Sequence, residues 1–265
     1  MYETILTERR GSIGVITLNR PELHNAFNEV LVAELNAVFD AAEKDESLHA
    51  LVLTGNGKSF CAGADTQWMR GMAKASQLEN REDSLQLARL MRRLNFIDIP
   101  TIAMVNGAAY GGGIGLIACC DIAIAAEDAK FALSEVKLGL VPAVISPYVV
   151  DAVGLRQARR LFTTGEVFDA AYAVRIGLLH ETVPADALYD TVVDIVKRLD
   201  KAGPVARRAS KRLALRVAGR NEREQAKLDA ENAELIARIR VSEEGQEGLT
   251  AFLEKRKPNW IKDEA

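Results

Sequence analysis

The sequence contains few of the residues on which disulfide frameworks and metal sites depend. Only three of its 265 residues are cysteine, and two of these, Cys119 and Cys120, are adjacent and do not normally pair with each other. No CxxC occurs, and the three histidines lie in no HExxH motif. A GxSxG motif is also missing, so there is no sign of a serine hydrolase. We therefore expect no metal, no disulfide and a reducing, cytoplasmic setting.

Long hydrophobic runs and an excess of one charge are missing as well. No apolar stretch reaches the roughly 18 residues that a membrane-spanning helix needs. The N-terminal segment MYETILTERRGSIGVITLNR contains acidic residues and lacks the apolar core of a secretory signal. Lys and Arg number 34 against 37 Asp and Glu, which gives a net charge of −3. We expect no membrane partner, no signal peptide and no nucleic-acid partner.

What the chain does contain is an alternation of short strands and helices. Strand-like segments at 13–18, 50–54, 101–105 and 121–126 are separated by helical ones, including one that starts after Asn28. This alternation predicts an α/β fold with parallel strands and crossover helices. From about Asp186 onward the sequence is typical of helix. We expect residues 1–200 to form the core and 201–265 a helical subdomain.

Two glycine- and alanine-rich loops follow neighbouring predicted strands. The first is SFCAGAD at 59–65, and the second is NGAAYGGG at 106–113. Parallel sheets place their ligand sites at the carboxyl ends of such strands, where helix N-termini offer free N–H groups. Two N–H groups, one from each loop, could meet on one oxygen and form an oxyanion hole. The alternative is that the three glycines only allow close packing of helix and strand.

The motifs resemble those of the enoyl-CoA hydratase/isomerase (crotonase) superfamily. FCAGAD, NGAAYGGG, CDIAIA and FALSEVKLGLVP follow one another at the separations typical of that family, and the similarity extends from residue 13 to residue 258. The resemblance implies a crotonase-like spiral of ββα units with a C-terminal helical subdomain that takes part in oligomerisation. It also implies a homo-trimer or homo-hexamer whose substrate is an acyl-CoA thioester, with coenzyme A as part of the substrate and no separate cofactor.

The family pattern assigns roles to individual residues. By motif position, the backbone N–H groups of Ala64 and Gly112 would hold the thioester oxygen. Contacts to the CoA moiety would come from a set of residues in three segments: Leu23, Ala26, Ala62, Ala64, Asp65, Thr66, Gln67 and Gly112. Several relatives carry a lysine where Gln67 stands, so one charged contact to the nucleotide would be missing.

The resemblance also identifies one catalytic carboxylate and indicates that the second carboxylate of many relatives is missing here. Glu135 stands where the family has a catalytic carboxylate, which would act as general acid and base at the carbon next to the thioester. Hydratases with two carboxylates carry the other one two residues after the GGG, and this chain has Gly115 there. Water must then be held by Glu135 itself or by another group. Ser134, Tyr110 and Tyr148 are candidates for that role.

The closest resemblance, over GLIACCDIAIA, LSEVKLGLVPAVISPYVV and the C-terminal RIRVSEEGQEGL, is to bacterial 3-methylglutaconyl-CoA hydratases of leucine and isovalerate metabolism. It implies reversible addition of water to 3-methylglutaconyl-CoA, or in reverse the dehydration of 3-hydroxy-3-methylglutaryl-CoA. Three alternatives stay open: a Δ3,Δ2-enoyl-CoA isomerase, a general short-chain enoyl-CoA hydratase, and a non-catalytic acyl-CoA- or RNA-binding protein.

A glutaconyl substrate ends in a carboxylate that needs a basic partner. Lys137, Arg70 and a C-terminal basic residue of a neighbouring subunit are the candidates. The segment 248–260, with Phe252, Lys255 and Lys257, would reach the CoA site of a neighbouring subunit if this chain assembles as the family does.

Overall fold

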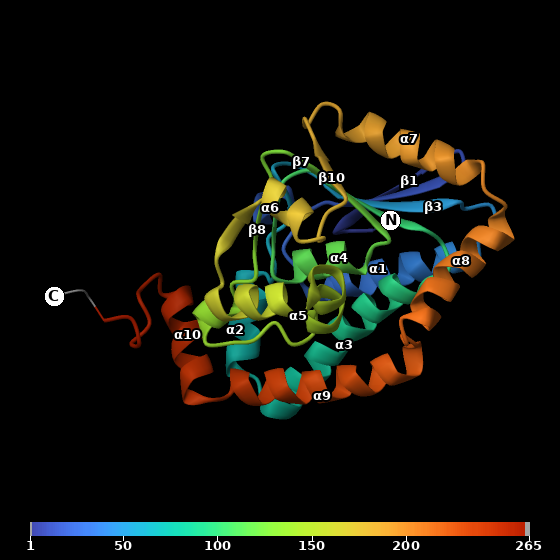
Figure 1. Ribbon diagram of the computed structural model, residues 1–265. Coiled ribbons are helices and arrows are strands. Elements are labelled where there is room, and N and C mark those ends of the chain that lie inside the picture. The colour runs from blue at the N-terminus through green and yellow to red at the C-terminus, as the bar shows by residue number, and fades with distance from the viewer. Residues whose placement is uncertain (1, 263–265) are drawn as a thin grey trace.

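Two β-sheets of unequal size form the centre of the molecule (Figure 1). The computed structural model describes residues 2–262. The larger sheet has six strands in the order β1-β2-β3-β5-β7-β10. Their bounds are Ile5–Arg10, Ile13–Leu18, Ala50–Gly55, Thr101–Val105, Ile122–Ala126 and Glu181–Val183. β1 and β2 form an antiparallel hairpin, and the other neighbours pair in parallel. The parallel sheet predicted from the sequence is therefore confirmed.

Helices cover both faces of this sheet, as its apolar strands require. On one face lies α7 (Leu188–Asp200), whose buried Leu188, Val192 and Val196 pack on strands β3, β5 and β7. The other face is covered by α1 (Glu29–Glu43), α3 (Gln77–Phe96) and α4 (Gly112–Cys119). Asn28 is the N-cap of α1, since its side chain accepts a hydrogen bond from the Leu31 N–H, as predicted.

Two of the four strands of the smaller sheet come from the two loops that the sequence analysis identified. Its order is β4-β6-β8-β9, with bounds Ser59–Cys61, Ala108–Tyr110, Lys130–Ala132 and Val167–Asp169. β4 and β6 pair in parallel, so the loop after β3 and the loop after β5 run side by side. These short strands were not predicted. They are the reason why the two small-residue segments end at the same place.

The remaining elements are helical and lie around the two sheets (Figure 1). They are η1 (Pro21–Leu23), α2 (Thr66–Lys74), η2 (Glu135–Leu138), α5 (Ser146–Thr164), α6 (Ala170–Arg175), α8 (Pro204–Val217), α9 (Glu222–Arg240) and α10 (Glu243–Leu253). The helical character predicted beyond Asp186 is confirmed. α9 runs along α3, and α10 packs against α2 and η2 of the same chain (Figure 1). No helix among the described residues is long and apolar enough to cross a membrane.

Candidate active site

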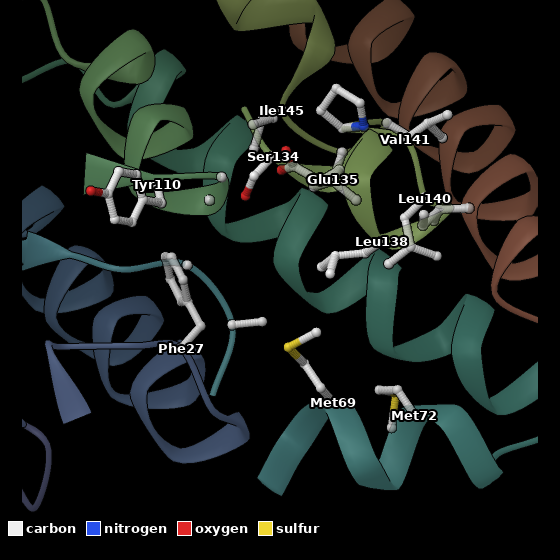
Figure 2. A pocket seen from close by; sticks show the side chains of 18 of the residues that line it. Phe27, Met69, Met72, Tyr110, Ser134, Glu135, Leu138, Leu140, Val141 and Ile145 are labelled. Carbon is white, nitrogen blue, oxygen red and sulfur yellow. The ribbon is translucent and has the colours of Figure 1, made fainter. Parts of the chain in front are cut away.

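A cavity of about 440 Å³ opens where the loops of the small sheet meet η2, α2 and α10. Figure 2 shows Glu135 and Ser134 on one side of it and Met69 and Met72 of α2 on the other. Ala62, Ala64, Gly112 and Glu135, four of the residues predicted to form the site, line this cavity. Most of the other lining side chains are apolar, namely Phe27, Leu87, Leu138, Leu140, Val141, Val144, Ile145, Ile236, Leu249 and Phe252.

Each of the three consecutive glycines is required by a different neighbour. A Cβ on Gly111 would lie 2.9 Å from Oε1 of Glu135, and its φ of +48° also disfavours other residues. A Cβ on Gly112 would lie 2.9 Å from the ring of Phe27, and one on Gly113 would lie 2.3 Å from the carbonyl oxygen of Cys61. Close packing within the protein thus accounts for all three positions, whatever else they do.

Backbone geometry leaves two N–H groups free to face the cavity. Phe27 pairs with Ala64 in a parallel bridge, in which the Phe27 N–H donates to Gly63 O at 2.7 Å and the Asp65 N–H donates to Phe27 O at 2.9 Å. The Ala64 N–H therefore points to the side opposite Phe27. Gly112 is the first residue of α4, where an N–H has no acceptor within the helix. Both residues line the cavity, and this arrangement can place one ligand oxygen between two donors.

The carboxyl group of Glu135 is held in an environment that favours its neutral form. Glu135 is the first residue of η2, directly after β8 and Ser134. Its Oε2 is buried and has no hydrogen-bond partner among the described residues. Burial raises the pKa of Glu135 from 4.5 to about 7. A carboxyl with a pKa near neutrality can both accept and donate a proton at physiological pH.

The position of the missing second carboxylate is filled by an apolar side chain. A Cβ on the buried Gly115 would lie 2.3 Å from Cγ2 of Ile145 and 3.2 Å from Cε of Met91. Ile145 belongs to the loop that leads into α5 and also lines the cavity. Gly115 therefore cannot simply be exchanged for glutamate, because Ile145 has taken the space.

Of the three hydroxyl groups suggested as partners for water, one lies beside Glu135. Ser134 lines the cavity next to that residue (Figure 2). The ring of Tyr110 lines the cavity, but its hydroxyl points away from Glu135 (Figure 2). Tyr148 is buried outside the lining, and its hydroxyl has no partner among residues 2–262.

The other residues predicted to contact CoA lie near the cavity but outside its lining. Asp65 caps α2 by accepting from the Gln67 N–H at 2.7 Å, and its second oxygen pairs with Arg20 Nη2 at 2.6 Å. Thr66 and Gln67 are exposed in the first turn of α2, Leu23 is exposed in η1, and Ala26 is buried. Their contacts with CoA stay predictions. For Asp65, the structure shows a role in fixing the loop that carries Ala64.

Two basic residues line the cavity, and only one of them was a candidate. Lys137 is an exposed residue of η2, as the sequence analysis proposed, whereas Arg70 is exposed on α2 and lies outside the lining. The second is Arg240, the last residue of α9. It lies within the C-terminal segment RIRVSEEGQEGL that carries part of the resemblance, but nothing in that segment assigned it a role. Phe252 also lines the cavity of its own chain.

The histidines have structural surroundings. His24 Nδ1 lies 3.0 Å from Ser59 Oγ, His49 Nδ1 pairs with Asp200 at 2.6 Å, and His180 Nδ1 lies 3.1 Å from the Ala123 N–H. None of them lines the cavity. Across residues 2–262, no three His, Cys, Asp or Glu side chains gather in a way that could hold a metal ion.

Comparison with known proteins gives a consistent result. A sequence profile of the enoyl-CoA hydratase/isomerase family matches residues 8–263. The crotonyl-CoA hydratase of Syntrophomonas wolfei is 36% identical over 265 residues, with 98% of each chain covered. The short-chain-enoyl-CoA hydratase of Clostridium acetobutylicum is 34% identical over 264 residues, again with 98% of each chain covered.

Solved structures agree. An enoyl-CoA hydratase from Shewanella pealeana is 44% identical with a TM-score of 0.79, covering 97% of this chain and 96% of that one. An enoyl-CoA hydratase from Mycobacterium avium is 35% identical with a TM-score of 0.84, covering 98% of this chain and 100% of that one. The crotonase-like fold expected from the motifs is therefore confirmed.

Proposed function

Because the chain belongs to the enoyl-CoA hydratase/isomerase family, we propose that it adds water reversibly to the double bond of 2-enoyl-CoA thioesters. The observation that carries this proposal is the position of Glu135 in the same small cavity as the N–H groups of Ala64 and Gly112. A proton carrier and two fixed donors are what addition next to a thioester requires.

In the proposed reaction, Glu135 serves both proton transfers. Its carboxylate takes a proton from water while the water oxygen bonds to C3 of the substrate. The electron pair of the double bond moves toward the thioester, and the negative charge on the thioester oxygen is held by the N–H groups of Ala64 and Gly112. Glu135 then gives the proton to C2 on the same face, which completes a syn addition. In this proposal Ser134, which lines the cavity beside Glu135 (Figure 2), orients the water.

The favoured substrate is 3-methylglutaconyl-CoA, giving 3-hydroxy-3-methylglutaryl-CoA, as in leucine and isovalerate metabolism. Support comes from the motif resemblance and from the basic residues Lys137 and Arg240 in an otherwise largely apolar cavity. A 2,3-dehydroadipyl-CoA hydratase of Escherichia coli is 33% identical over 257 residues, covering 97% of this chain and 98% of that one. The acyl group in its name also ends in a carboxylate.

A panel of enoyl-CoA substrates tests the proposal directly. Turnover would be measured with crotonyl-CoA, a longer straight-chain enoyl-CoA, 3-methylcrotonyl-CoA and 3-methylglutaconyl-CoA. The proposal expects hydration of several of these, with the highest kcat/KM for 3-methylglutaconyl-CoA. If crotonyl-CoA has the higher value, the enzyme is a general short-chain hydratase. No turnover above the buffer rate for any of them would contradict catalysis.

The isomerase alternative needs a separate measurement, because one carboxylate is enough to move a proton between C2 and C4. Reaction in H₂¹⁸O distinguishes the two activities. A hydratase incorporates ¹⁸O into the product, whereas a Δ3,Δ2-isomerase shifts the double bond without taking up oxygen from water.

The proposal includes no cofactor apart from the CoA of the substrate, since proton transfer and N–H donors supply the chemistry. Dialysis against EDTA should leave turnover unchanged. It also includes a homo-trimer or homo-hexamer and a cytoplasmic location. Cys61, Cys119 and Cys120 form no disulfide within the described residues.

A further inference from the structure

One wall of the cavity carries a guanidinium beside an indole. Arg240 of α9 and Trp68 of α2 both line the cavity. The buried indole N–H of Trp68 interacts with the carboxyl group of Asp83 and helps to lower its pKa, and it has no closer hydrogen-bond partner within residues 2–262. The guanidinium of Arg240 is therefore the group of this wall that can meet a ligand.

Arg240 is anchored on one side only. Its Nη1 lies 3.1 Å from Asp83 Oδ2, 3.3 Å from Asn80 Oδ1 and 3.3 Å from Ser84 Oγ, all on α3. A guanidinium has five N–H donors in a rigid plane. Within residues 2–262, no acceptor contacts Nε or Nη2 of Arg240. The anchored edge fixes the plane of the guanidinium, and the other edge remains available for a ligand.

The charges around the cavity favour an anion. Arg240 and Lys137 are the cations of the lining, and Glu135 is its one carboxyl group in the described part of the chain. Asp83 lies outside the lining. Burial raises the pKa of Asp83, while Arg240 and the indole of Trp68 oppose that rise. Asp83 therefore orients Arg240 from behind, and Lys137 forms no ion pair within residues 2–262.

We propose that Arg240 binds a carboxylate at the far end of the acyl chain. The enzyme would thereby select 2-enoyl-CoA thioesters whose acyl group ends in a carboxylate. This inference rests on the hydratase function proposed above. Arg240 suits the role better than Lys137, because a planar fork matches the two oxygens of a carboxylate and a flexible ammonium does not.

A purely structural role for Arg240 makes different predictions. The pair with Asp83 links α9 to α3, and breaking such a link lowers stability without regard to the substrate. Arg92 of α3 provides a matched control, because it pairs with the buried Asp229 of α9 and so links the same two helices outside this cavity. If Arg240 recognises the substrate, its replacement must change the preference between substrates, whereas the replacement of Arg92 must leave that preference unchanged.

The test measures kcat/KM for 3-methylglutaconyl-CoA and for 3-methylcrotonyl-CoA, which lacks the carboxylate, and follows the ratio of the two. Arg240→Gln should lower this ratio about 10- to 100-fold, the size expected when a charge-assisted hydrogen bond is lost. Arg92→Gln should leave the ratio at the wild-type value.

Asp83→Asn separates recognition from helix linkage most sharply. It breaks the same ion pair as Arg240→Gln, but it keeps Arg240 and removes the opposing charge. The ratio should therefore stay unchanged or rise. If Arg240→Gln folds poorly because Asp83 is left unpaired, the double variant Asp83→Asn with Arg240→Gln restores neutrality and should still show the low ratio.

The inference is overturned if Asp83→Asn and Arg240→Gln lower the ratio equally, or if neither changes it. It is also overturned if the wild-type enzyme hydrates 3-methylcrotonyl-CoA as well as it does 3-methylglutaconyl-CoA. Failure of the hydratase proposal is distinguishable from these outcomes, because the wild-type enzyme would then hydrate neither thioester.

Discussion

The side chain of Ile145 occupies the space that any side chain at position 115 would need. Its Cγ2 would lie 2.3 Å from a Cβ built on Gly115, well inside van der Waals contact. The two residues come from different elements, since Gly115 lies in α4 and Ile145 precedes α5. The packing of the cavity wall therefore excludes a second carboxylate at position 115. The difference from hydratases with two carboxylates involves Ile145 as well as Gly115.

The first prediction tests this relationship with a double-mutant cycle. Gly115→Ala should lower the free energy of unfolding by about 1–3 kcal/mol, because a methyl group is forced into a filled space. Ile145→Ala should be destabilising alone, but it removes the clashing Cγ2. In the double variant, the cost of Gly115→Ala should largely disappear, with a coupling energy of about 1 kcal/mol or more. Urea unfolding measures all four proteins. Simple additivity of the two costs would contradict the packing relationship.

The second prediction concerns the proton carrier. Glu135→Gln should lower kcat by about 10²–10⁴-fold, the usual contribution of a positioned acid or base, because no other carboxyl group lines the described cavity. Binding of acyl-CoA should change little, since glutamine has nearly the same shape. Steady-state kinetics and isothermal titration with a saturated acyl-CoA measure the two quantities. Retention of more than about a tenth of wild-type turnover would remove Glu135 from this role.

The third prediction follows from the raised pKa of Glu135. Addition of water starts from the carboxylate, so kcat/KM should fall about tenfold per pH unit below pH 7 and level off above it. The folded protein holds this proton more tightly than the unfolded chain. The resulting stability is fully present below pH 4.5 and is lost as the pH rises through about 7.

Glu135→Gln should therefore unfold at higher urea than the wild type at pH 8, and the difference should vanish near pH 4.5. With one pKa unit equal to 1.36 kcal/mol, its upper limit is about 3 kcal/mol. A difference between the two proteins that stays constant with pH would show that the pKa of Glu135 is not raised.

Local sequence patterns predicted the four central strands of the larger sheet, whereas its outer strands β1 and β10 were not predicted. β2, β3, β5 and β7 are runs of β-branched and apolar residues bounded by turns, and their limits differ from prediction by at most one residue. β4, β6, β8 and β9 have three residues each, which is too short for an alternating or β-branched pattern to be recognised in the sequence. Their pairing depends on contacts between distant segments.

The sequence predicted those residues of the candidate site that belong to the family motifs. Ala64, Gly112 and Glu135 were identified by the resemblance, and the structure brings them into one cavity. Arg240 belongs to the quoted segment RIRVSEEGQEGL, but its place at the cavity could not be predicted, because it depends on the packing of α9 along α3. Ile145 could not be connected with Gly115 either, since nothing in a sequence shows which side chain fills the space of an absent one.

The fourth prediction concerns assembly and the CoA end of the substrate. The monomer mass is 28.9 kDa, and light scattering should give three or six times this value. Lys255→Glu should raise KM for acyl-CoA severalfold with little change in kcat, because an ammonium acts as a point charge for a phosphate. Lys44→Glu, at the exposed end of α1, is the control and should leave KM unchanged. A stable monomer and an unchanged KM would contradict the proposed role of the C-terminal segment.

The fifth prediction separates two functions of the glycine run. A Cβ on Gly112 must displace the ring of Phe27, which is fully buried and pairs through its backbone with Ala64. Gly112→Ala should therefore disturb both proposed donors at once, and kcat should fall at least tenfold, since one lost donor alone costs about 10²–10³ in comparable sites. Gly112→Val should be more damaging still.

Gly71 is a matched control for this substitution. It lies in α2, and a Cβ there meets nothing within 4 Å, so Gly71→Ala should leave kcat unchanged and raise stability by up to about 1 kcal/mol. Thermal unfolding of both variants shows whether Gly112→Ala remains folded. A folded Gly112→Ala with wild-type kcat/KM would mean that Gly112 serves only the packing of Phe27, and that the thioester oxygen is held elsewhere.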